Sequence, residues 1–84
     1  MNLYLLMQNE TSGYDTYDSM VVAAETEDRA RLIHPNTWSD NPWDRTKLLY
    51  IDWATSPDQV SVELIGTAVE GTKAGVILSS FNAG

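Results

Sequence analysis

The residues best suited to chemistry in this chain are the tyrosines, tryptophans and aspartates of two short segments. Residues 13–18 contain two tyrosines and two aspartates, and residues 36–45 contain two tryptophans and two aspartates. A cationic side chain can stack on such a ring and pair with such an acid, so this mixture suits a partner that offers Arg or Lys. The candidate partner-binding residues are Tyr14, Asp15, Tyr17, Asp18, Trp38, Asp40, Trp43 and Asp44.

The same aspartates could in principle hold a metal or form a catalytic pair. A calcium loop needs oxygen ligands at its first, third and fifth positions and Gly at the sixth. Counted from Asp15 the third position is Tyr17, and counted from Asp40 it is Pro42, so neither segment matches. Two carboxylates could meet in space as a hydrolase pair, but no spacing along the chain indicates one. We predict no metal site and no cofactor.

The chain has few residues that could support nucleophilic catalysis. His34 is the only histidine, and the chain has no Cys. A triad could form only through His34, which precedes Pro35 at the predicted end of a helix, where a cation needs no catalytic reason. Glu70 to Lys73 resembles the tail of a phosphate-binding loop but lacks its first Gly, so a turn is the better interpretation. We predict no catalytic residues and no enzymatic activity.

Charge and length limit the remaining classes of function. The 84 residues form one domain, 1–84, with 12 acidic and 5 basic residues and a formal net charge of −7. Such a domain repels phosphate, which disfavours direct binding to nucleic acid or to an anionic membrane. The excess charge either keeps the protein soluble or steers it toward a basic partner. The apolar run near the N-terminus is too short for a signal peptide, so we expect a soluble, cytoplasmic protein.

Hydrophobic patterning predicts an α+β fold, with a mainly antiparallel sheet of four or five strands and one short helix packed on it. Residues 3–7 are apolar on both alternating faces, which is typical of an interior strand and places this strand at the centre of the sheet. Thr26 is the predicted helix cap, and Pro35 ends the helix. Residues 56–59 have capping-box spacing with Pro at the first helical position, enough for one turn. The predicted strands are 3–7, 19–25, 47–53, 60–67 and 76–81, and the predicted helix is 26–34.

Three stretches carry a resemblance to a known group of proteins. Residues 13–35, 52–66 and 75–84 resemble a family of short, acidic proteins encoded by bacteriophages and prophages, which are usually described as hypothetical proteins. The 13–18 loop and the Ser-Phe-Asn-Ala-Gly ending are the most specific parts, and residues 36–50 match no pattern. The resemblance implies a phage setting but carries no catalytic site. Small acidic phage proteins often occlude a nucleic-acid-binding or defence protein of the host, with carboxylates in place of phosphates.

Three functions remain open. The first is a non-enzymatic phage accessory protein that binds a bacterial host protein with a basic surface, through the acidic and aromatic residues named above. The second is a minor virion or assembly protein that forms homo-oligomers through an exposed strand edge such as residues 76–81. The third is a small-molecule or nucleotide-binding module, which the acidic balance disfavours. Against the first stands a structural alternative, in which the tryptophans fill the core and the aspartates only form turns.

Overall fold

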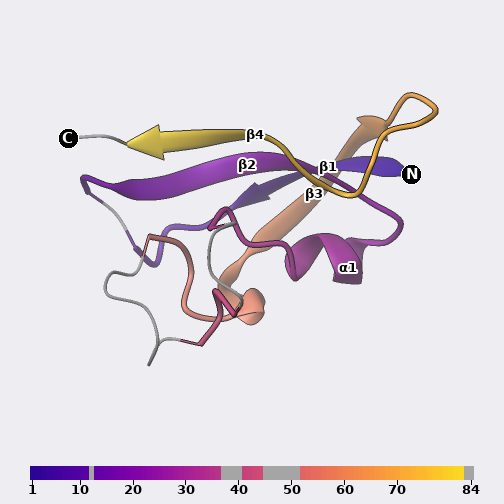
Figure 1. The fold of residues 1–84 in the computed structure, drawn as a ribbon. Helices are drawn as coiled ribbons and strands as arrows, with labels where there is room; N and C mark the ends of the chain where they lie inside the picture. The colour runs from indigo at the N-terminus through magenta and orange to yellow at the C-terminus, as the bar shows by residue number, and fades with distance from the viewer. Residues whose placement is uncertain (12, 37–40, 45–51, 83–84) are drawn as a thin grey trace.

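A computed structural model describes residues 1–11, 13–36, 41–44 and 52–82 of the chain (Figure 1). It contains a four-stranded antiparallel sheet with the order β3-β1-β2-β4 and one short α-helix. This is the α+β architecture that the sequence predicts. In the described part of the chain, no helix has both the length and the apolar character needed to cross a membrane. The elements are β1 (Asn2–Met7), β2 (Thr16–Ala24), α1 (Glu27–Arg31), η2 (Pro57–Gln59), β3 (Ser61–Thr67) and β4 (Gly75–Asn82).

Strand β1 lies inside the sheet between β2 and β3, which confirms its predicted central position. Its side chains alternate because successive residues of a strand point to opposite faces. Tyr4 and Leu6 are buried on one face, whereas Leu3 and Leu5 are only partly buried on the other. Residues opposite each other in an antiparallel pair share a face, so this division continues into the neighbouring strands, with exceptions such as the fully buried Ala23 opposite Leu3.

Strands β3 and β4 follow each other along the chain but lie at opposite edges of the sheet. Among the described strands, β3 pairs only with β1 and β4 pairs only with β2, so the connection 68–74 must cross the end of the sheet. Ala68 donates its backbone N–H to the Met1 carbonyl, 3.0 Å away, which holds the start of this connection against the chain terminus. Gly71 and Gly75 take positive φ angles of 90° and 138° there, a conformation that glycine adopts without strain.

Helix α1 covers one face of the sheet. The Thr26 side chain accepts a hydrogen bond from the Arg29 N–H, which confirms the predicted cap. Ala30 is fully buried and belongs to the same cluster as Leu6, Val22 and Trp53. The α1 helix and the segment around η2 lie on this side of the sheet in Figure 1, which we call the covered face.

Several element boundaries differ from those predicted. The helix ends at Arg31, earlier than predicted, and the next residues continue only as a turn. The predicted strand 47–53 falls largely outside the described residues, and its described end, Asp52 and Trp53, is not a strand. Ser56 precedes η2 as predicted but makes no side-chain capping bond. The other predicted strands are present with ends that differ by up to three residues.

Candidate functional site

The face of the sheet opposite α1 is the first feature that needs an explanation. Antiparallel sheets that expose one face to water usually place polar residues there. Here the register instead aligns Leu5 with Val21 of β2, and Val21 with Leu78 of β4. Leu78 is 69% exposed and Met7 is 44% exposed. None of the described elements packs over this side, which we call the open face (Figure 1).

A shallow depression runs along the open face. Its volume is about 240 Å³, and its apolar walls come from Leu5, Val21 and Leu78. Ser19 and Ser80, which face each other across β2 and β4, form its polar end. These exposed apolar side chains make the depression a candidate contact surface.

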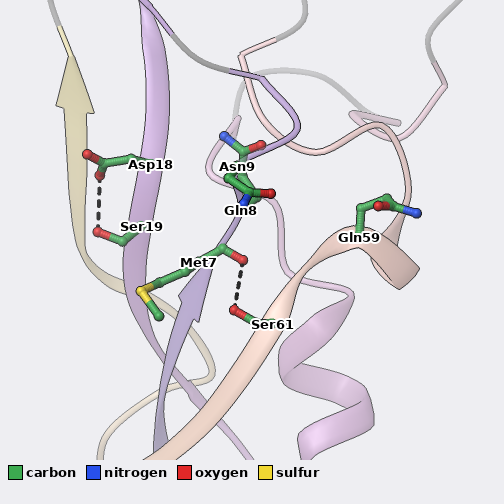
Figure 2. A pocket seen from close by; sticks show the side chains of 7 residues that line it. All are labelled: Met7, Gln8, Asn9, Asp18, Ser19, Gln59 and Ser61. Atoms are coloured by element: carbon green, nitrogen blue, oxygen red, sulfur yellow. Dashed lines mark hydrogen bonds between the residues drawn. The ribbon is translucent and has the colours of Figure 1, made fainter.

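A larger hollow of about 550 Å³ begins where the depression ends, because Ser19 lines both (Figure 2). Figure 2 shows side chains from three separate parts of the chain around it: the end of β1, the start of β2 and the junction of η2 with β3. Met7 supplies an apolar wall between β1 and β2. The residues that line the hollow are Met7, Gln8, Asn9, Asp18, Ser19, Gln59 and Ser61.

The polar groups of this hollow are rich in acceptors. Asp18 is exposed, and its Oδ1 accepts a hydrogen bond from the Ser19 hydroxyl at 3.1 Å. Asn9 and Gln59 add amide oxygens, and among the described residues that line the hollow there is no basic side chain. The charge around the hollow is therefore negative, and Met7 can pack against the aliphatic part of a bound cation.

Gln8 makes the rim of the hollow rigid. Its amide nitrogen donates to the Thr11 and Tyr17 carbonyls at 2.7 and 2.8 Å, and its amide oxygen accepts from the Thr11 N–H at 2.8 Å. Both ends of the buried amide are therefore used within the protein. The Glu10 carboxylate extends this anchoring, because it accepts from the N–H and the hydroxyl of Thr55 at 2.7 and 2.8 Å. The turn after β1 is thus fixed to β2 and to the segment before η2.

The predicted residues of the 13–18 segment separate in space. Asp18 lines the hollow, and Tyr14 and Asp15 are exposed in the loop before β2. Tyr17 instead packs against the core, with its ring centroid 4.7 Å from that of Phe81. Burial raises the pKa of Tyr17, and the nearby Asp52 carboxylate raises it further.

The 36–45 segment contributes little that the structure describes. Trp43 packs against the core, and its indole N–H donates to the Leu32 carbonyl at 2.9 Å. It therefore belongs to the covered face, on the opposite side of the sheet from the hollow. Asp44 is partly buried and closes a turn with Asn41 through its backbone N–H. Trp38 and Asp40 lie outside the described residues.

His34 has a structural position. It is buried, its Nδ1 accepts from the Asn36 N–H at 2.9 Å, and its ring meets that of Trp43 edge-on at 4.8 Å. Burial lowers the pKa of His34 to about 4. His34 therefore packs in the structure as a neutral imidazole and not as a cation that interacts with the helix end.

Within the described ranges, no three His, Asp or Glu side chains gather closely enough to hold an ion.

Sequence reasoning identified Asp18 but not Met7, Asn9, Gln59 or Ser61. The apolar alternation of residues 3–7 on both faces is the available signal for Met7, but it predicts burial on both sides of the strand, whereas Met7 is exposed. No local signal marks the other three.

Comparisons with known proteins do not assign this chain to a family. No protein-family model matches the chain, and neither the curated proteins nor the solved structures contain a match to it.

Proposed function

We propose that this domain is a non-enzymatic binding module that recognises a basic, partly apolar surface of another protein through its open face. The observation that carries the proposal is the continuity of the apolar depression with an acceptor-rich hollow, whose lining in the described part of the chain includes Asp18 and no basic side chain. A Lys or Arg of the partner enters the hollow, and apolar side chains beside it cover Leu5, Val21 and Leu78.

Charge complementarity supports this choice of partner. Glu63 lies opposite Leu5 in the register and so shares the open face, where it adds a second carboxylate to that of Asp18. The net charge of −7 steers a basic protein toward the domain and repels phosphate-bearing ligands. A nucleotide-binding function is the weaker alternative for that reason.

The resemblance to phage and prophage proteins makes a bacterial host protein the proposed partner. A basic host surface that normally binds nucleic acid would meet the carboxylates in place of phosphates. On this proposal the domain acts by occupying such a surface, in the cytoplasm of the infected cell. Tyr14 and Asp15 of the exposed loop extend the acidic and aromatic character beyond the hollow.

The direct test uses a defined probe. Acetylated arginine amide is titrated into isotopically labelled protein, and amide chemical shifts are followed by NMR. We expect saturable shifts at Asn9, Asp18, Ser19 and Ser61, which weaken in Asp18→Asn and persist in the charge-matched control Glu70→Gln. Shifts spread evenly over all acidic residues, or unchanged by Asp18→Asn, would contradict the assignment.

The partner itself is tested by capture from bacterial lysate. Specific retention should fall with added salt, because exposed charges are screened over about 8 Å at physiological ionic strength. It should also fall in Asp18→Asn and in Leu78→Glu, whereas Glu70→Gln should leave it intact. Retention that survives both open-face substitutions would place the interface elsewhere.

A further inference from the structure

The outer edge of β4 has a composition that natural edge strands avoid. Edge strands present unpaired backbone N–H and C=O groups, and proteins protect them with charges, Pro or bulges. The other edge strand, β3, carries Glu63, whereas β4 has eight residues with no charge and no Pro. In a chain with 17 charged residues of 84, such a strand is a surface on which two acidic copies can meet.

The geometry of β4 defines where a second strand would fit. The register with β2 shifts between Val22–Val76 and Val21–Leu78, so Ile77 is a bulge that disturbs the first part of the strand. The second shift leaves Asp18 as an extra residue on β2, not on β4. Residues 78–82 of β4 are therefore a regular, uncharged segment of five residues.

We propose that β4 pairs with β4 of a second copy of this chain, antiparallel and centred on Ser80, to form one eight-stranded sheet. A twofold axis through Ser80 places Ser80 opposite its counterpart and Ser79 opposite Phe81 of the second copy. Phe81 is 45% exposed on its own and would be covered by that pairing. The two open faces would join into one surface.

A second copy suits this edge because the pairing is self-complementary. No charge faces a like charge across the axis within 78–82. The nearest acidic side chain along the adjacent strand, Asp18, is separated from its counterpart by three strand spacings, about 14 Å. This distance exceeds the screening length of about 8 Å at physiological salt. At low salt the screening length of about 30 Å exceeds this separation, so raising the salt to the physiological level should strengthen the dimer. The same change weakens binding to a basic partner, so the two proposals can fail independently.

Cysteine cross-linking tests the register directly, since the chain has no native Cys. Opposite residues of an antiparallel pair have Cβ atoms about 4.5 to 5.5 Å apart, near the reach of a disulfide. We expect oxidised Ser80→Cys to form a covalent dimer, and Thr67→Cys on the β3 edge to remain monomeric. Cross-linking of both variants to the same extent would indicate random collision and overturn the proposal.

Sedimentation of the cysteine-free protein provides the second measurement. The dimer fraction should rise with protein concentration and on going from about 0.01 M to about 0.15 M salt, as the screening length falls from about 30 to about 8 Å. Ser80→Lys sets two like charges opposite each other and should weaken dimerisation by up to about fivefold, an effect of up to about 1 kcal/mol. Thr67→Lys makes the same charge change on the other edge and should leave the dimer intact. A monomer at all concentrations and both salt levels would show that β4 does not pair with a second copy.

Discussion

The buried imidazole of His34 makes the folded protein sensitive to acid. Its pKa is lowered by burial to about 4, below the usual 6.5, so the unfolded chain binds more protons between these values. Stability is therefore complete above pH 6.5 and falls as the pH drops toward 4. Because nearby solvent screens part of the charge, we expect a loss on the order of 1 to 2 kcal/mol.

Chemical denaturation at a series of pH values measures this loss. His34→Asn keeps an acceptor for the Asn36 N–H and removes the titrating ring, so its stability should be nearly constant between pH 7 and pH 5. Burial also raises the pKa of the Asp52 carboxyl, which favours the folded state in acid and acts in the opposite direction at lower pH. Equal pH dependence in the two proteins would exclude His34 as the cause.

Trp53 is the second residue whose environment makes a clear prediction. Its side chain is fully buried in the core, and its indole nitrogen has no hydrogen-bond partner in the described structure. Trp53→Ala should cost about 3 to 5 kcal/mol of folding free energy through the cavity that it leaves. Trp53→Phe removes an unpaired donor along with part of the volume, so it should cost much less. Thermal or urea unfolding of both variants measures the two losses, and equal losses would contradict the prediction.

At the scale of elements, the features that depend only on neighbouring residues were predicted well from the sequence. Thr26 is followed at once by acidic residues and a short apolar period, and all the information for that cap lies within one turn. The Ser56 spacing is equally local, but the η2 turn is so tight that the Gln59 N–H bonds the Ser56 carbonyl at 3.1 Å. In a capping box the Ser56 hydroxyl would accept a hydrogen bond from this same Gln59 N–H, so the hydroxyl has no capping role here.

The open face and the hollow could not be predicted from neighbouring residues in the sequence. Alternation shows which residues of β1 share a face, but not whether anything packs on that face. The hollow combines Met7, Asp18 and Gln59 from segments that meet only after the sheet has formed. Its position depends on β3 lying beside β1, whereas the next strand along the chain, β4, joins the far edge. Sequence reasoning identified Asp18 as an acid in a loop, and only tertiary structure supplies its neighbours.

The cap of α1 is testable at this scale. The helix has only five residues, so its stability depends strongly on its first hydrogen bond and on the packing of Ala30. Thr26→Ala removes the acceptor of the Arg29 N–H and should destabilise the domain by about 1 kcal/mol. Thr26→Ser keeps the acceptor and should be close to wild type in denaturant unfolding. Equal destabilisation by both substitutions would assign the effect to the lost methyl group instead.

For the whole molecule, the net charge decides how copies of the protein meet. At pH 7 a charge of −7 keeps them apart except where the surface is uncharged, as at β4. The charge falls to zero near pH 4.2, the isoelectric point. At that pH the repulsion has vanished and His34 has begun to protonate, so the fold is weaker while its uncharged edge is still exposed.

We therefore expect self-association to rise steeply as the pH approaches 4.2, and to begin at β4. Light scattering across this pH range should show a smaller rise for Ser80→Lys than for Thr67→Lys. Both substitutions add one positive charge and shift the isoelectric point equally, so any difference between them reports the position and not the charge. Matching curves for the two variants would mean that acid association proceeds through unfolded chains, with no part for the β4 edge. A smaller rise for Ser80→Lys alone would identify the uncharged strand as the site where neutralised copies first meet.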